Sequence, residues 1–183
     1  ALVTRRPSLT IRAGIGRTFQ IMQPFEDLSV LENVATGALF GRRPARSVRE
    51  ALGRAAELCE RVGLGERTGW RPSELNPAEL KRLELARALA TAPRLLLLDE
   101  VLGGLTPAEH QQAVRLIRSL RDEDGITILL IDHVMKPVRN LADRVLALNF
   151  GRAVAEGRFD EVASHPQVIA AYLGGGEEQA GKT

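Results

Sequence analysis

The spacing of apolar residues changes along the chain and separates a helical first part from a second part that alternates strands with helices. In the first part a short apolar and β-prone stretch, GIGRTFQ, predicts an extended segment that ends near Gln20. Helical spacing then covers three stretches, 28–39, 47–62 and 77–92. The breaks between them are polar and contain glycine or proline, as expected of loops.

The second and third of these helices have clear start signals. Ser47 is placed to cap the second. In the third, Asn76 is a good N-cap, Pro77 suits the first turn, and Glu79 follows the cap by three residues, as in a capping box. The residues predicted to be buried are Val48, Leu52, Ala55, Leu58 and Val62 in the second helix and Leu80, Leu83, Ala86, Leu89 and Ala90 in the third.

The second part of the chain alternates continuous apolar runs with amphipathic helices. The runs are typical of strands buried on both faces: 94–100, 127–132 and 144–150. Helices are predicted between them, over 107–121 and 134–142. This order predicts a parallel α/β sheet. Farther on, 151–157 indicates a small hairpin or edge strand, and 160–173 indicates two short helices.

Composition and charge narrow the class of protein. The chain has 183 residues, of which 44% are hydrophobic, which is enough for a core of ordinary size. Its 25 basic and 23 acidic side chains are interleaved, so no nucleic-acid-binding surface is indicated. The single cysteine, Cys59, excludes a disulfide within the chain and is predicted to be a buried structural thiol. No apolar run approaches the ~20 residues that span a bilayer and no signal peptide is visible, which fits a cytosolic protein.

The strongest chemical signal is the segment LLLLDE, in which an apolar strand ends in Asp99 and Glu100. In a parallel sheet this edge is where ligands bind. In nucleotide hydrolysis the first acid can hold Mg²⁺ and the second can orient or deprotonate the attacking water. The alternative is a strand that simply ends in solvated acids. His133 follows the next apolar strand and Gln20 follows the first extended segment, so three strand ends deliver polar groups.

Several ordered motifs resemble the nucleotide-binding domain of an ABC transporter. They are GIGRTFQ, LKRLELARALATAPRLLLLDE, GGLTPAE, GITILLIDHVMKPV and ADRVLALNFGRAVAEG. Within that superfamily the chain is most similar to the ATPase subunits of branched-chain amino-acid importers, from about Ile15 to Gly174. The resemblance implies an α/β fold, with a P-loop NTPase-like parallel sheet and an inserted helical subdomain.

The resemblance also implies a role for each matching residue. Gln20 is the Q-loop glutamine and a Mg²⁺ ligand, Asp99 is the other Mg²⁺ ligand, Glu100 is the catalytic base and His133 is the switch histidine. The signature loop that faces the partner's ATP comprises Leu75, Asn76, Pro77, Ala78 and Glu79, and the D-loop comprises Gly104, Leu105 and Thr106.

The family's organisation gives expected domain boundaries and partners. Residues 1–24 are the remnant of the catalytic core, 25–90 the helical subdomain, 91–150 the catalytic α/β core, 151–173 a C-terminal hairpin and helices, and 174–183 a flexible tail. Family members bind ATP and Mg²⁺ and work as paired ATPases, either homodimers or heterodimers. They act with transmembrane permease subunits and, indirectly, a solute-binding protein, on the cytoplasmic face of the plasma membrane. No nucleic acid is expected as a partner.

The family's phosphate-binding loop, Walker A, belongs upstream of the Q-loop, and the chain begins too late to contain it. Truncation of a longer subunit is therefore expected, with a genuine pseudo-ATPase as the alternative. The eight residues 176–183, GEEQAGKT, match the pattern G-x-x-x-x-G-K-[ST]. No strand is predicted before this match, and Glu177 and Glu178 would oppose a phosphate, so we interpret it as coincidence.

The signature loop departs from the family's LSGGQ, or LSYGE in relatives of this importer class, because it reads LNPAE in this chain. Ala78 adds a methyl group where glycine allows close approach, and Pro77 removes an N–H donor. Either contact with the γ-phosphate of ATP is weakened, or the segment serves only as a helix cap. For the whole chain we expect a transport ATPase that couples ATP hydrolysis to uptake of branched-chain amino acids or a similar small solute. The alternative is a catalytically silent regulatory or truncated partner that lends its signature loop and helical subdomain to a competent ATPase.

Overall fold

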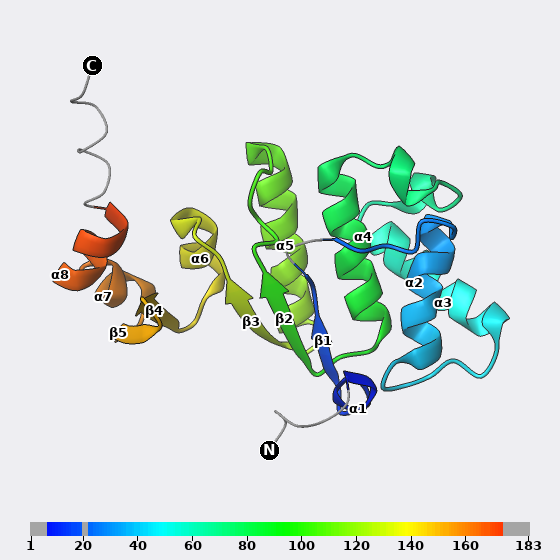
Figure 1. The fold of residues 1–183 in the computed structure, drawn as a ribbon, viewed down its shortest axis with the longest axis horizontal. Helices are drawn as coiled ribbons and strands as arrows, with labels where there is room; N and C mark the ends of the chain where they lie inside the picture. Colours follow the sequence, from blue (N-terminus) through cyan, green and yellow to red (C-terminus); the bar gives the residue numbers. More distant parts are fainter. Residues whose placement is uncertain (1–6, 20–21, 174–183) are drawn as a thin grey trace. The chain divides into compact units, whose positions relative to one another are not determined.

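The computed structural model describes residues 7–19 and 22–173, and the chain divides into two compact units, 1–134 and 135–183 (Figure 1). Each unit has its own sheet. In the part of the chain that is described, no helix combines the length and the apolar character needed to cross a bilayer. Two of the sequence-based expectations, for Gln20 and for the 174–183 tail, lie outside the described residues.

The sheet of the first unit has three parallel strands in the order β1 (Ile15–Arg17), β2 (Leu95–Asp99) and β3 (Thr127–Ile131). This confirms the predicted parallel α/β arrangement. The central strand β2 buries Leu96 and Leu98 almost completely, because it has a neighbour on each side. A short helix, α1 (Pro7–Arg12), precedes β1 and was not predicted.

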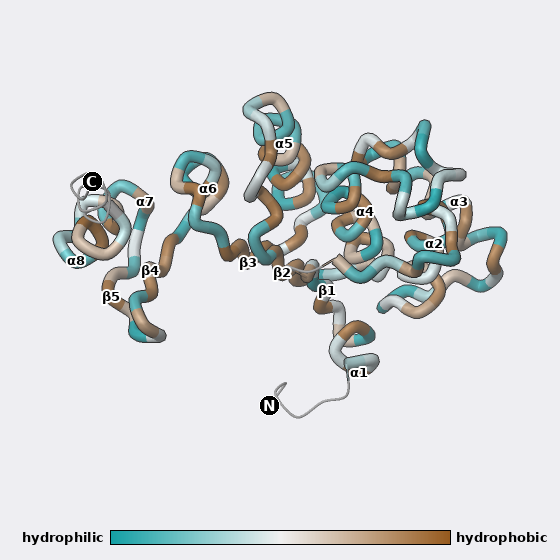
Figure 2. Tube along the Cα trace, turned by 45° about the horizontal axis from the view of Figure 1, so that its top comes forward, coloured by the Kyte–Doolittle hydropathy of each residue, from teal (hydrophilic) through white to brown (hydrophobic). Residues whose placement is uncertain are grey.

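The expectation that the second long strand is buried on both faces is wrong. In β3, Leu129 is 56% exposed and Ile131 is 59% exposed, so the strand alternates instead. The reason is that β3 is an edge strand of this sheet and, among the described residues, one of its faces is left uncovered. Figure 2 shows the apolar colour continuing along β2 and β3 despite this difference in burial.

A layer of three helices packs together in the first unit: α2 (Val30–Phe40), α3 (Val48–Arg61) and α4 (Pro77–Ala90). The first begins two residues later than predicted, because Ser29 caps it through a capping box with Glu32. Gly37 permits the close approach of α2 to α4, since a Cβ at that position would lie 2.6 Å from the Arg87 carbonyl oxygen. Two short 3-10 turns, η2 (Gly65–Arg67) and η3 (Pro72–Glu74), connect α3 to α4.

The buried face of α3 agrees only in part with the predicted one. Ala55 and Val62 are buried as predicted, and so is Cys59, but Val48 is 63% exposed and Leu52 and Leu58 are only partly buried. Packing against α2 selects the stripe of small residues Ala51, Ala55 and Cys59, which lets the two helices come close. Burial raises the pKa of the Cys59 thiol to about 11, as expected of an unreactive structural cysteine.

Helix α4 is buried over more than one stripe, because it packs against α2 and α3 and also contacts β1. Its predicted capping box is confirmed, with Asn76 at the N-cap and Glu79 as the third residue. Leu80 is only partly buried, contrary to expectation. The buried residues of α4 are Leu83, Glu84, Leu85, Ala86, Ala88, Leu89 and Ala90.

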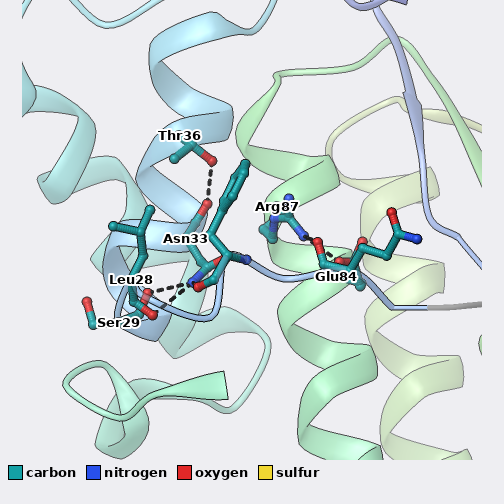
Figure 3. Close-up of polar contacts among 8 residues, drawn as sticks. Leu28, Ser29, Asn33, Thr36, Glu84 and Arg87 are labelled. Atoms are coloured by element: carbon teal, nitrogen blue, oxygen red, sulfur yellow. Dashed lines mark hydrogen bonds and ion pairs between the residues drawn. The ribbon is translucent and has the colours of Figure 1, made fainter. Parts of the chain in front are cut away.

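The loop before α2 is held by one fully buried amide, that of Asn33 (Figure 3). Its Oδ1 accepts the backbone N–H of Phe25 at 2.8 Å. Its Nδ2 lies within hydrogen-bond distance of three carbonyl oxygens, those of Phe25 (3.0 Å), Leu28 (3.1 Å) and Ser29 (3.0 Å). This side chain satisfies the backbone of the loop at a place that water does not reach.

The remaining helix of the first unit is α5 (Pro107–Asp122), which begins at the predicted residue and is capped by Thr106 through a capping box with Glu109. The second unit begins with α6 (Met135–Leu141), followed by β4 (Val145–Asn149) and β5 (Arg152–Gly157). It ends with α7 (Phe159–Ala163), α8 (Pro166–Val168) and a π-helical turn, η4 (Ile169–Leu173). Its core contains Ala147, Val162 and Val168.

The strand expected to be third in the parallel sheet pairs instead with its immediate successor. β4 and β5 form an antiparallel hairpin, so of the two alternatives predicted for 151–157, a small hairpin or an edge strand, the structure has a single strand that pairs with β4. The chain reverses at Phe150 and Gly151, both of which have positive φ values (46° and 77°). Such a tight turn favours local antiparallel pairing.

Candidate functional site

Asp99 and Glu100 lie at the carboxyl end of β2, the central strand of the three-stranded sheet. The sheet fixes this position because β2 is hydrogen-bonded on both sides. Next to it, Thr18 follows β1; its N–H donates to the Leu97 carbonyl at 3.0 Å, and its hydroxyl accepts the Asp99 N–H at 3.2 Å. The backbone of Asp99 is therefore hydrogen-bonded at the point where the chain leaves β2.

The backbone at Glu100 is in the left-handed region, with φ at 49°. For a residue with a Cβ this conformation costs about 1–2 kcal/mol. Its N–H donates to the Ile131 carbonyl at 2.9 Å, so the last bond of the β2–β3 ladder holds the residue as the chain leaves the strand. Strain of this kind persists only where the surroundings fix it, and it occurs often at functional sites.

His133 lies two residues beyond β3 and faces Glu100. The His133 Nδ1 atom is 3.8 Å from the Glu100 Oε1 atom, and the two side chains are 66% and 38% exposed. Asp132, the residue before His133, connects the loop after β3 to the loop after β2. Its Oδ1 accepts the Val134 N–H at 2.9 Å and its Oδ2 accepts the Leu102 N–H at 3.3 Å. The two predicted side chains thus lie side by side, accessible to a ligand.

The oxygens at this edge suit a magnesium ion that keeps most of its water. Asp99, Glu100 and Thr18 line one small cavity. The described residues contain no cluster of three or more His, Cys, Asp or Glu side chains around a common metal position. Mg²⁺ usually takes only one or two carboxylates and completes its shell with water and phosphate oxygens, so Asp99 fits this role. Asp99 also forms an ion pair with Arg17, whose Nη2 atom lies 3.3 Å from Asp99 Oδ2.

A buried ion pair that the sequence did not reveal lies beside the same cavity (Figure 3). Glu84, on α4, is 6% exposed, and its Oε1 is 2.5 Å from Arg87 Nη1. Arg87 also donates to the Gln23 carbonyl at 2.9 Å and lies over the Phe25 ring. The only available sequence signal was a pair of opposite charges three residues apart within an amphipathic helix that carries other charges.

The predicted signature residues form the start of α4, where the capping box uses their polar groups. Asn76 Oδ1 accepts the Glu79 N–H at 2.9 Å, and Glu79 Oε2 accepts the Asn76 N–H at 3.0 Å. Glu79 Oε1 also accepts from Arg67 Nε at 3.2 Å. The Asn76 N–H and then the Arg67 guanidinium lower the pKa of the Glu79 carboxyl below its usual range. Leu75, in contrast, is buried.

The predicted D-loop residues lead into α5. Gly104 has a positive φ of 71°, which glycine adopts without strain. Thr106 caps α5 by accepting the Glu109 N–H at 3.3 Å. Leu105 and Ala78 line one groove of about 360 Å³ between α4 and α5, so the structure places signature and D-loop positions along a common surface.

Two family models match the chain. The model described as ABC transporter covers residues 3–103, and the model described as branched-chain amino acid ATP-binding cassette transporter covers residues 154–178. Among curated relatives, the high-affinity branched-chain amino acid transport ATP-binding protein LivG of Salmonella typhimurium is 41% identical over 175 residues, covering 89% of this chain and 69% of LivG. The methionine import ATP-binding protein MetN of Caulobacter vibrioides is 42% identical over 156 residues, covering 85% of this chain and 46% of MetN.

Solved structures agree with the sequence comparisons. The ADP conformation of MJ1267, an ATP-binding cassette of an ABC transporter, matches with a TM-score of 0.79 and 28% identity, covering 93% of this chain and 72% of that one. The dimeric post-hydrolysis state of the cassette MJ0796, bound to ADP and Pi, matches with a TM-score of 0.77 and 26% identity, covering 85% and 68%. The chain therefore belongs to the ABC transporter family, as an ATP-binding protein of the branched-chain amino acid importer type.

Proposed function

We propose that this chain is the ATP-hydrolysing subunit of an importer for branched-chain amino acids or a similar small solute. The observation that carries the proposal is the meeting of Glu100 and His133 at the carboxyl edge of the sheet, with 3.8 Å between Oε1 and Nδ1. Asp99 begins the same turn. The names of the relatives, LivG and MetN among them, support the choice of solute class.

Each side chain has a distinct task in hydrolysis. The Glu100 carboxylate accepts a proton from the water that attacks the γ-phosphorus of ATP. His133, exposed beside it, donates a hydrogen bond to the phosphoryl group as negative charge develops there. Asp99 and Gln20 would hold Mg²⁺, which would supply positive charge against the phosphates of ATP. Gln20 lies outside the described residues, so its part rests on the sequence motif.

The pairing of two subunits completes this proposal. The segment 75–79 would face the ATP of a second ATPase subunit, and 104–106 would line the same interface. Support comes from the groove that Ala78 and Leu105 share, and from the dimeric state of the MJ0796 cassette. The subunit would sit on the cytoplasmic face of the plasma membrane against transmembrane permease subunits, which receive solute from a binding protein.

The test is Glu100→Gln in the assembled transporter, which keeps the shape of the side chain and removes its ability to take a proton. We expect ATP hydrolysis to fall by about 10²–10⁴-fold, the usual contribution of a general base, while ATP binding is retained. A phosphate-release assay measures the first and equilibrium binding the second. Hydrolysis at the wild-type rate would refute the assignment of Glu100.

A second candidate, a catalytically silent partner, is favoured by the start of α4. Pro77 has no N–H, and the Glu79 N–H is already bound by Asn76. The Asn76 and Glu79 side chains are likewise engaged with each other's backbone in the capping box. The same Glu100→Gln variant discriminates, because a silent subunit loses no hydrolysis of its own when Glu100 is changed.

We also propose that residues 1–183 by themselves bind ATP weakly and do not hydrolyse it. The single match to the phosphate-loop pattern in this sequence is 176–183, which lies outside the described residues. Within 1–175 no lysine follows a glycine-rich run that would wrap the β- and γ-phosphates.

A further inference from the structure

Lys81 reaches from α4 to the turn that follows Glu100. Its Nζ atom donates to the Glu100 carbonyl oxygen at 3.3 Å and also to the Gly103 carbonyl oxygen. These two carbonyls lie at either end of a tight four-residue turn. A single cation on a neighbouring helix therefore closes the turn that begins with the proposed catalytic base.

This turn needs support because its own bonding is weak. Glu100 is in the left-handed region, and the bond across the turn, from the Gly103 N–H to the Glu100 carbonyl, is long at 3.4 Å. Leu102 has separate partners, because Asp132 accepts its N–H and His110 Nε2 lies 2.7 Å from its carbonyl. Lys81 adds hydrogen bonds to the carbonyl oxygens of Glu100 and Gly103, the first and last residues of the turn.

Lys81, His133 and Glu100 converge on Gly103. A Cβ built at Gly103 would lie 3.9 Å from Lys81 Nζ, 3.9 Å from His133 Cε1 and 3.8 Å from the Glu100 carbonyl oxygen. Lys81 also lines the small cavity that contains Asp99 and Glu100. The Lys81 ammonium group thus contacts the backbone of residues 100–103.

We propose that Lys81 is a positioning residue, which sets the Glu100 carboxylate relative to His133 by fixing the backbone of residues 100–103. The inference rests on the proposed function, since it assumes that Glu100 works on the attacking water. Lys81 lies two residues beyond segment 75–79 on the same helix. Helix α4 therefore joins the segment that would face the partner's ATP to the turn that carries this subunit's own base.

The experiment compares Lys81→Met with Lys81→Arg in the complete, assembled transporter. Methionine keeps most of the side-chain stem and removes the charge, and arginine restores a cationic donor. We expect Lys81→Met to lower kcat for ATP hydrolysis roughly tenfold with KM within roughly twofold, because a misplaced base affects the transition state and not substrate binding. Lys81→Arg should recover at least about half of the wild-type kcat.

Arg115→Met is the control, since Arg115 is an exposed basic residue of α5 that lines neither the small cavity nor the groove shared by Ala78 and Leu105. It should leave kcat unchanged. A second readout is hydrogen exchange of the Gly103 amide, which we expect to quicken in Lys81→Met and to return to the wild-type rate in Lys81→Arg.

Three results would overturn the proposal: unchanged exchange, unchanged kcat, or a raised KM for ATP at normal kcat, which would make Lys81 a nucleotide contact. Failure of the proposed function is seen separately. In that case Glu100→Gln hydrolyses ATP normally, whatever Lys81→Met does to the exchange of Gly103.

Discussion

At the scale of single residues, Asn33 shows how one buried amide determines a loop. Its side chain is fully buried, accepts the Phe25 N–H, and lies within hydrogen-bond distance of three backbone carbonyl oxygens (Figure 3). We expect Asn33→Ala to lower the free energy of unfolding by ~2–3 kcal/mol, because it leaves several buried backbone groups without partners. Urea unfolding followed by circular dichroism measures the change.

The matched control is Gln111→Ala, which removes an exposed amide from α5. It should change the free energy of unfolding by less than about 0.5 kcal/mol, as is usual for surface substitutions. If Asn33→Ala and Gln111→Ala unfold at the same urea concentration, the buried amide does not hold the loop.

The residues at the ends of the strands were predictable, and those that support them were not. Asp99, Glu100 and His133 follow apolar runs, and parallel strands bring such ends to one edge, so the sequence pattern was sufficient. Lys81 and Arg87 lie within an amphipathic helix, where a charged residue is usually a solvated one. Their partners are backbone carbonyls distant in sequence, and no residue type marks those.

At the scale of elements, start signals were more reliable than buried faces. The capping box of α4 follows from three letters, because it depends on atoms within one turn. The buried stripe of α3 depends on which side α2 approaches, which its own sequence does not contain. Likewise the pairing of β4 with β5 was decided by the turn at Phe150 and Gly151, after the strand itself had been predicted correctly.

The helix starts also predict how stability depends on pH. At four of them a backbone N–H lowers the pKa of a glutamate below its ordinary value of 4.5: Glu32, Glu50, Glu79 and Glu109. A carboxyl with a lowered pKa in the folded chain stabilises it above pH 4.5, and this contribution is lost as pH falls through the folded-state pKa. We therefore expect the urea midpoint to fall steadily below about pH 4.5.

Glu79→Gln tests the contribution of one such cap. The variant should be less stable than the wild type near neutral pH and should lose less stability on acidification, so that the two curves converge at low pH. Glu57→Gln, at an exposed position within α3, is the control and should run parallel to the wild type. Parallel curves for Glu79→Gln would show that this carboxylate adds nothing to folding.

At the scale of the whole molecule, membership of the ABC transporter family and possession of a working nucleotide site are separate matters. Family membership follows from similarity along most of the chain, including 41% identity to LivG. A nucleotide site needs in addition a backbone nest and a lysine for the phosphates. The match at 176–183 is preceded by Ile169–Leu173, a π-helical turn and not the strand that a phosphate loop follows.

Titration with a fluorescent ATP analogue and Mg²⁺ tests whether residues 1–183, which belong to the family, also contain a working nucleotide site. We expect binding weaker than about 100 μM, because Asp99 and Glu100 then face the triphosphate without a phosphate-loop lysine and backbone nest to offset its charge. The control is Lys182→Ala, which removes the one lysine of the 176–183 match and should leave the titration unchanged. Low-micromolar affinity that Lys182→Ala abolishes would show instead that this segment is a phosphate site, and the proposal of weak binding would be wrong.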